Sequence, residues 1–167
     1  MSGYTVRMTP LAWLVGLFLP ACAAIGARGL PVPPPTDLAH ISRPASPNTA
    51  LAAPAGFHPA PDIVTPVFPA SAEQLFAAVQ KVAAAEPRTW AAAIYADRMQ
   101  ADWVVRSAVF NFPDLVTAQI APAGLGAATL VLYSRSVYGY SDLGVNRRRV
   151  VAWLAALDRT LNPAKER

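Results

Sequence analysis

The side chains that could do chemistry in this 167-residue chain gather in its last third, around the end of a predicted strand and the start of a helix. Carboxylates can act as acids or bases, hydroxyls as nucleophiles, and guanidinium groups can hold phosphate or carboxylate ions. The cluster that offers these groups consists of Asp114, Ser134, Arg135, Ser136, Ser141, Asp142, Asn146 and Arg147.

A structural interpretation accounts for this cluster without any ligand. On a strand, Arg135 points to the opposite face from Ser134 and Ser136, because successive side chains alternate. Ser141 or Asp142 then stands where a helix N-cap is expected, since short side-chain oxygens accept from the free N–H groups of the first turn. The cluster is then a strand, a turn and a capped helix.

One arginine is predicted to point inward from that helix. Arg147 lies four residues after Leu143 and three before Val150, and both of these belong to the predicted apolar stripe. A buried guanidinium without a partner is strongly unfavourable, so a carboxylate should meet it. The sequence therefore predicts a buried or half-buried pair between Arg147 and either Asp114 or Asp142.

A second interpretation makes the start of the helix an anion site. Free backbone N–H groups, together with Arg135 or Arg147, could hold a phosphate or a carboxylate. A resident carboxylate at Asp142 argues against this, because it would occupy the same donors and repel another anion.

Two further arginines, Arg148 and Arg149, are expected on the outer faces of the helix. Arg149 has the i, i+4 spacing that would let it stack on Trp153. In a domain tethered to a membrane, such residues could face anionic headgroups or a protein partner.

Several short motifs of this region resemble a known family. They are "FPD" at Phe112–Asp114, "SRS" at Ser134–Ser136 and "GYSDLGVNRRRV" from Gly139 onward. Their order is similar to that in the bacterial and chloroplast proteins grouped as domain of unknown function 1499, over roughly residues 62–161. The resemblance implies no activity. It implies that the signature positions are Asp114, Ser134, Arg135, Ser136, Ser141, Asp142, Asn146, Arg147 and Arg149.

Histidine and cysteine are expected to be missing from the folded domain. His40 and His58 fall in a proline-rich stretch, and Cys22 is the only cysteine. We therefore predict no catalytic residues, no metal site and no cofactor. The glycine-containing "AGLGA" lacks the lysine and helix of a phosphate loop. A histidine-independent hydrolase stays open as an alternative, working through Ser134, Ser141, Asp114 or Asp142.

The first 21 residues are predicted to be an export signal. Arg7 precedes the apolar run "LAWLVGLFL", which is too short to span a bilayer. The following "LPAC" resembles the lipobox of bacterial lipoproteins, in which the cysteine becomes the lipidated first residue. Cys22 is thus the predicted lipidation site, and the alternative is ordinary cleavage that releases a soluble secreted protein.

Residues 22–61 are predicted to be a lipidated cysteine followed by a disordered, Pro/Ala-rich tether. Eleven of the 17 prolines lie between residues 28 and 69, without helical or alternating apolar periodicity. Proline fixes φ and removes a backbone donor, which favours an extended spacer over a strand or helix.

Residues 62–162 are predicted to form one α+β domain, followed by a tail at 163–167. A capping box at Ser71 and Gln74 starts a helix that ends near Pro87, and a second helix covers 142–161. Strands are expected at 62–68, as an edge strand because of Pro66, and at 89–97, 102–110, 114–121 and 128–138. The fold class is a five-stranded antiparallel sheet with two helices on one face, in the order β-α-β-β-β-β-α.

The charge balance disfavours nucleic acid as a partner. The chain carries 14 Lys and Arg against 10 Asp and Glu, and from residue 62 onward the count is 11 against 9. The expected protein is a non-catalytic binding or accessory module of the bacterial cell envelope, anchored to a membrane through its N-terminal lipid and facing the periplasm. The alternative is a small lipid- or amphiphile-binding protein, with a cavity lined by Trp90, Ile94, Trp103, Leu132 and Trp153, although these residues could equally fill the core.

Overall fold

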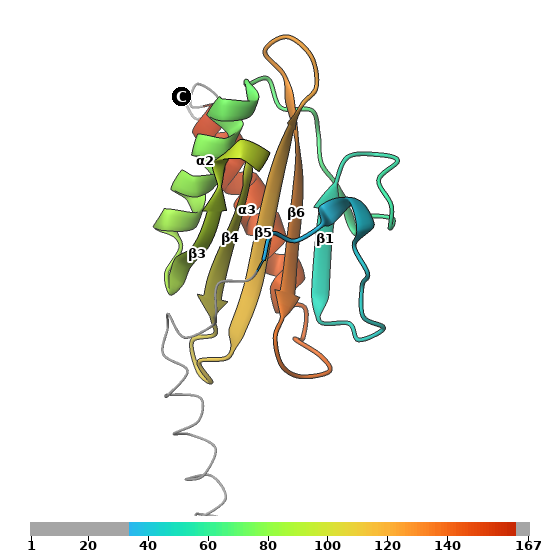
Figure 1. Ribbon diagram of the computed structural model, residues 1–167. Coiled ribbons are helices and arrows are strands. Elements are labelled where there is room, and N and C mark those ends of the chain that lie inside the picture. Colours follow the sequence, from blue (N-terminus) through green and yellow to red (C-terminus); the bar gives the residue numbers. More distant parts are fainter. Residues whose placement is uncertain (1–33, 163–167) are drawn as a thin grey trace, which may run out of the picture.

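A six-stranded sheet carries two α-helices on one of its faces in the computed structural model, which describes residues 34–162 (Figure 1). The strand order is β2-β1-β6-β5-β4-β3. The predicted α+β class with two helices is confirmed, whereas the prediction of five antiparallel strands is wrong: the sheet has a sixth strand and one parallel pair. The strands are β1 (Thr49–Ala53), β2 (Ile63–Val64), β3 (Thr89–Tyr95), β4 (Gln100–Arg106), β5 (Pro113–Pro122) and β6 (Ala128–Ser136).

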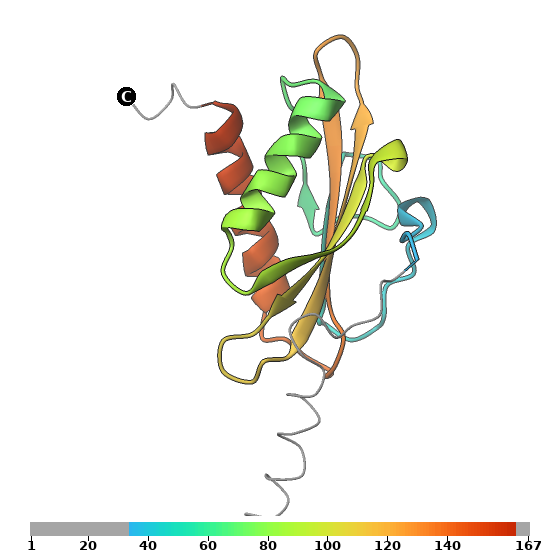
Figure 2. The same cartoon turned by 60° about the vertical axis from the view of Figure 1, so that its left-hand side comes forward.

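Strands β3 to β6 form the predicted antiparallel meander. Alternation gives the sheet two different faces. On β5, Val116, Ala118 and Ile120 belong to the main hydrophobic core, whereas Thr117 and Gln119 point to the opposite face. We call the face that packs against the helices the helix face, and the opposite one the far face (Figure 2).

The strand that the sequence did not predict is β1. It pairs antiparallel with β6, from Thr49 opposite Arg135 to Ala52 opposite Leu132, and parallel with the two residues of β2. Its side chains are small and nearly all buried, because α3 crosses one face and the N-terminal segment covers the other. Alanine has low strand propensity, so tertiary packing rather than local preference makes this strand.

The prediction of a disordered tether over residues 22–61 is therefore wrong for residues 34–61. Residues 34–48 run over the far face and include a short 3-10 helix, η1 (Leu38–His40). Leu38 is buried there with Leu51, Ala53 and Tyr133 in a second, smaller core. The prolines of residues 34–61 thus belong to a folded segment. Cys22, the predicted signal (1–21) and the tail (163–167) lie outside the described residues.

The first long helix, α2 (Ala72–Ala85), begins as predicted. Ser71 Oγ accepts from the backbone N of Gln74, whose side chain accepts in turn from the backbone N of Ser71. These reciprocal bonds satisfy donors that have no partner within the helix. The buried side of α2 then packs on the sheet through Leu75, Val79 and Val82.

The second long helix, α3 (Val145–Leu161), begins three residues later than predicted. Val150, Trp153 and Leu157 are its buried apolar residues, and Trp153 meets Trp103 of β4 edge-on with ring centroids 5.6 Å apart. Leu143 precedes the helix and is exposed, so it is not part of the stripe. Within residues 34–162 no helix combines the length and apolar character needed to cross a bilayer.

Candidate functional site

The residues of the signature meet around the side chain of Asn146, in the first turn of α3. Its Nδ2 donates to the backbone O of Asn48 and to Ser136 Oγ, both at 2.9 Å. Its Oδ1 accepts from Ser134 Oγ at 2.5 Å and from Arg149 Nη1 at 2.8 Å. Asn146 and Ser134 are completely buried. One amide thus joins three parts of the chain: α3, the end of β6 and the start of β1.

An ion pair extends this network. Arg149 Nη2 lies 2.6 Å from Asp114 Oδ2 at the start of β5, and the side chains are only 10% and 8% exposed. Arg149 Nη1 also donates to Ser134 Oγ at 2.9 Å. The guanidinium therefore reaches β5, β6 and its own helix, and the carboxylate compensates its charge. We call Asn48, Asp114, Ser134, Ser136, Asn146 and Arg149 the polar network.

The prediction that Arg147 is the inward-pointing arginine is wrong. Arg147 is exposed, and its Nη1 donates to the backbone O of Asp62 at 3.2 Å. Counting from Leu143 gave the wrong phase, because Leu143 lies outside the helix in a left-handed conformation (φ 54°). Counted from Val150, the buried face falls on 146, 149, 153 and 157, so Arg149 takes the inward position instead of the predicted stack on Trp153.

The N-cap of α3 is Gly144, so the prediction of Ser141 or Asp142 at that position is wrong, but the Asp142 carboxylate still reaches the first turn. Asp142 Oδ1 accepts from the backbone N of Gly144 at 2.9 Å, and Oδ2 accepts from the backbone N of Asn146 at 2.6 Å. Ser141 Oγ accepts from the backbone N of Leu143 in an exposed position. The donors that an anion site would need are thus engaged by Asp142, and the geometry does not favour that interpretation.

Arg135 lies on the far face, as the alternation along β6 predicts. The Cζ atom of Arg135 stands 5.4 Å from the ring centroid of Tyr133. The positive charge of Arg135 also acts on the carboxylate of Asp102 in β4. Asp102 is buried and accepts a hydrogen bond from Thr117 Oγ1 at 2.5 Å. Burial raises the pKa of Asp102, and the Thr117 hydrogen bond and the Arg135 charge only partly oppose this rise.

Several polar atoms under the N-terminal segment have no hydrogen-bond partner among the described residues. They are Oδ2 of Asp102, Oε1 of Gln100 and one terminal nitrogen of Arg135. Gln100 Nε2, in contrast, donates to the backbone O of Thr36 at 3.1 Å, which ties the segment to β4. The far face is thus the less completely satisfied of the two polar regions.

Sequence reasoning missed three of the residues that matter most. Arg149 was placed at a signature position but assigned to the outside, and Asn48 was assigned to the tether. Asp102 was not placed in the predicted cluster, because its burial depends on a segment far away in sequence. An asparagine at the start of β1 could not be found until the strand itself was known.

The expectation that the folded part lacks histidine is also wrong, because residues 34–61 belong to it. His40 Nδ1 lies 2.8 Å from Asp37 Oδ2 on the surface of η1, with the side chains 84% and 62% exposed. Hydrogen bonding to His40 lowers the pKa of Asp37. Within residues 34–162 no three His, Cys, Asp or Glu side chains gather as a metal site would require.

The five residues expected to line an amphiphile cavity do not surround a common space. Trp103, Trp153 and Leu132 fill the main core, while Ile94 is half exposed. Trp90 stands opposite Val104 on the far face.

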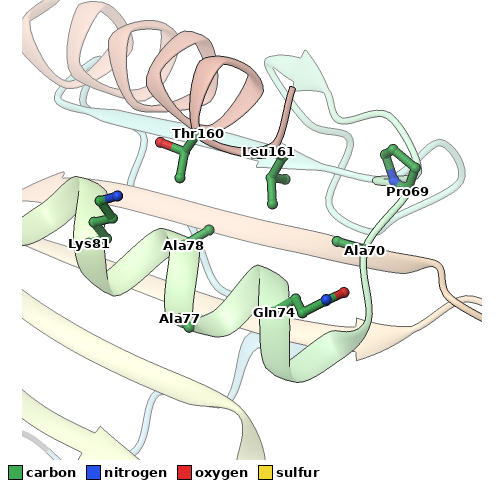
Figure 3. A pocket seen from close by; sticks show the side chains of 8 residues that line it. All are labelled: Pro69, Ala70, Gln74, Ala77, Ala78, Lys81, Thr160 and Leu161. Carbon is green, nitrogen blue, oxygen red and sulfur yellow. The ribbon is translucent and has the colours of Figure 1, made fainter. Parts of the chain in front are cut away.

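The hollows of this region lie instead on the solvent side of the helices. A groove of about 440 Å³ runs between α2 and the end of α3 (Figure 3). It is lined by Pro69, Ala70, Gln74, Ala77, Ala78, Lys81, Thr160 and Leu161.

Comparison with known proteins agrees with the signature. No curated protein and no solved structure matches this chain. Residues 41–157, more than two thirds of the chain, match the family described as "Protein of unknown function (DUF1499)". The match begins well before residue 62, so it includes β1 and Asn48 of the polar network. The chain belongs to the DUF1499 family.

Proposed function

We propose that this protein is a non-catalytic binding or accessory module of the bacterial cell envelope, held at a membrane by a lipid on Cys22. The proposal that the protein is not an enzyme rests on the hydrogen bonds and the burial of the signature side chains. Asp114, Ser134, Ser136, Asn146 and Arg149 bond to one another or to backbone groups, in positions that are mostly buried. Such a network fixes the docking of a helix on a sheet.

The geometry gives little support to a hydrolase that works without histidine. Ser134 is fully buried, and its hydroxyl both donates to Asn146 and accepts from Arg149. The Asp114 carboxylate is bound to that same arginine. A nucleophile needs a free approach to the substrate and a nearby base, and this hydroxyl has instead an amide oxygen and a cation as neighbours.

The support for the membrane anchor is the sequence before the described residues. The apolar run at 11–19 and "LPAC" at 19–22 have the order of an export signal and lipobox. The start of the described chain also limits how far the domain can lie from a lipid on Cys22. Twelve residue steps separate Cys22 from Pro34, where the described chain begins, and they span at most roughly 40 Å. A lipid on Cys22 would hold the domain close to the bilayer.

A small amphiphile remains the second candidate ligand, now placed in the groove of Figure 3. The observation that favours it is the groove's lining, which is made largely of alanine, proline and leucine side chains with Lys81 among them. Lipid extraction of the purified full chain, followed by mass spectrometry, tests this candidate. A stoichiometric amphiphile that is lost in Ala77→Trp, at an exposed position of the groove lining, would support it.

The anchor is tested by intact-mass and peptide mass spectrometry of the protein purified from the membranes of a bacterial host. We expect an N-terminal Cys22 that carries acyl chains, and we expect the Cys22→Ala variant to leave the membrane fraction or to stay unprocessed. A mature N-terminus at another residue, without lipid, would contradict the anchor. A pull-down from gently solubilised membranes then searches for the partner.

A further inference from the structure

Two loops lie together at one end of the sheet. The β4–β5 loop (107–112) and the β6–α3 loop (137–144) both follow strands that end there, as Figures 1 and 2 show at the lower end of the sheet. The first residue after β6, Val137, donates its backbone N–H to the backbone O of Pro113 at 3.2 Å. The bases of the two loops are therefore joined.

Large apolar and aromatic side chains project from both loops into solvent. They are between 44% and 84% exposed, and Phe110 and Phe112 stack on each other with ring centroids 5.7 Å apart. Together they form what we call the loop-end patch: Val109, Phe110, Phe112, Tyr138, Tyr140 and Leu143. Single exposed apolar residues are ordinary, whereas a group of six on adjacent loops indicates an interaction surface.

The loops hold these side chains outward in defined conformations. Leu143 and Asn111 both have positive φ, 54° and 55°, which residues with a side chain rarely adopt. Ser107 fixes the first loop, because its Oγ accepts from the backbone N of Phe112 and its own N donates to the backbone O of Phe112. Ser141 Oγ accepts from the backbone N of Leu143 in the second loop.

The charges around the loop-end patch are predominantly positive. Three exposed arginines flank the two loops: Arg88 is hydrogen-bonded through its backbone O to Arg106, just before the first loop, and Arg147 and Arg148 lie in the first turn of α3, just after the second. Of the nearby carboxylates, Asp114 pairs with Arg149, whereas Asp142 accepts two backbone N–H groups, which carry no net charge, so the three arginines outnumber Asp142 but do not stand alone.

Two further acids lie near the arginines: Glu86, half-buried at the end of α2, and Asp62, whose backbone O accepts from Arg147 and whose carboxylate pairs with Arg43. A surface of aromatic tips with a basic rim is complementary to an anionic, amphipathic partner.

We propose that the loop-end patch docks on the membrane, with its aromatic tips in the interface of an anionic lipid bilayer and its arginines against the headgroups. Aromatic rings favour the membrane–water interface, and basic residues beside it are attracted to anionic lipids. The choice of a bilayer over a protein partner rests on the proposed anchor at Cys22. The reach of roughly 40 Å from Cys22 exceeds the approximately 34 Å of the ten-residue strand β5, so this end of the sheet can reach the bilayer.

The test uses the full chain as the cell processes it, reconstituted into protein-free vesicles. Tyr140→Cys places an environment-sensitive fluorophore in the loop-end patch, and Leu125→Cys places it in the exposed β5–β6 turn at the other end of the sheet. The parent protein, with Cys22 as its only native thiol, gives the background. With phosphatidylglycerol present, we expect the label at 140 to shift to the blue and to be quenched by nitroxide lipids. We expect neither change at position 125.

Charge variants test the arginine rim. Arg147→Glu combined with Arg148→Glu should abolish the shift at position 140, whereas Arg159→Glu, an exposed arginine near the other end of α3, should leave it unchanged. Unchanged circular dichroism and melting temperature show that the variants are folded. The proposal would be overturned if the labels at 140 and 125 showed the same fluorescence shift and quenching. It would also be overturned if quenching at 140 depended neither on the anionic lipid nor on the charge reversal.

The outcomes separate this inference from the proposed anchor. A lipidated Cys22 with a solvent-exposed label at position 140 leaves the anchor intact and overturns the docking surface. An unlipidated chain whose label at 140 still enters anionic vesicles supports the docking surface and overturns the anchor. Protection of position 140 in native membranes but not in protein-free vesicles indicates a protein partner and overturns the bilayer as the occupant.

Discussion

Arg149 and Asp114 hold the last helix on the sheet through an ion pair of 2.6 Å whose two side chains are almost completely buried. The pair joins residues 35 positions apart, one in α3 and one in β5. Its arginine also donates to Ser134 and Asn146. Removing either partner would leave an uncompensated charge in the protein interior.

The first prediction concerns this pair. Arg149→Ala should lower the free energy of unfolding by about 3–5 kcal/mol, because Asp114 would be left buried without a counter-charge. Its neighbour Arg147→Ala should change it by less than about 0.5 kcal/mol, as is usual for an exposed side chain. Urea unfolding followed by circular dichroism measures both. Equal effects of the two substitutions would contradict the assignment of Arg149 as the inward arginine.

The second prediction concerns the amide at the centre of the polar network. Asn146→Ala should destabilise the fold by about 2–4 kcal/mol, because Ser134, Ser136 and the backbone O of Asn48 each lose a partner. Thermal unfolding gives the loss. The matched control is Asn162→Ala, which removes only an exposed amide bound to Asp158. A loss for Asn146→Ala no larger than that of the control would show that the network contributes little.

The third prediction concerns pH. Because burial raises the pKa of Asp102 in the folded state above the value of about 3.9 in the unfolded chain, ionisation of this residue opposes folding. The stability associated with its protonated form is complete below about pH 4 and is lost as the pH rises through the raised pKa. Asp102→Asn keeps an oxygen for Thr117 and should therefore be more stable than the parent protein at pH 7.

Denaturant unfolding at pH 3.5 and at pH 7 checks this prediction. The difference between Asp102→Asn and the parent protein should be small at the acid pH and should grow toward neutrality. Asp97→Asn, at an exposed position of η2 (Ala96–Arg98), serves as the control for removing one negative charge. A difference that does not change with pH would mean that Asp102 titrates normally.

The fourth prediction tests whether residues 49–53 form a buried strand, as in the structure, or a disordered tether. Ala52→Asp should destabilise the protein by about 3–5 kcal/mol, because Ala52 is fully buried in β1 and the new carboxylate would have no partner. Ala55→Asp, three residues further on and exposed, should be nearly neutral. Hydrogen exchange of residues 49–53 should show protection close to that of β6. Fast exchange there would contradict the sixth strand.

The parts of the fold that local sequence encodes could be predicted. The capping box of Ser71 and Gln74 and the spacing of Leu75, Val79 and Val82 indicated α2, and they are found there. Four β-branched and aromatic-rich runs joined by short connections indicated an antiparallel meander. Each of these signals needs only neighbours within a few residues of one another.

The parts that depend on distant residues could not be predicted. In "TALAA" the side chains are too small to give a periodic signal, and the prolines around it also suit a linker. The strand forms because β6 offers a free edge and Leu38 and α3 cover its two faces. The phase of α3 was missed for a related reason: Leu143 is apolar, yet the left-handed turn at Leu143 and Gly144 places it before the helix.

The position of β1 also determines when, during synthesis of the chain, the sheet can form. This strand is made early and pairs with β6, which is made late, and Asn146 bonds to a carbonyl 98 residues before it. Contacts between such remote segments form slowly and only after nearly all of the chain is available. The sheet therefore stays open until nearly all of the polypeptide has left the ribosome, and Asn146 can join the two distant segments only after that point.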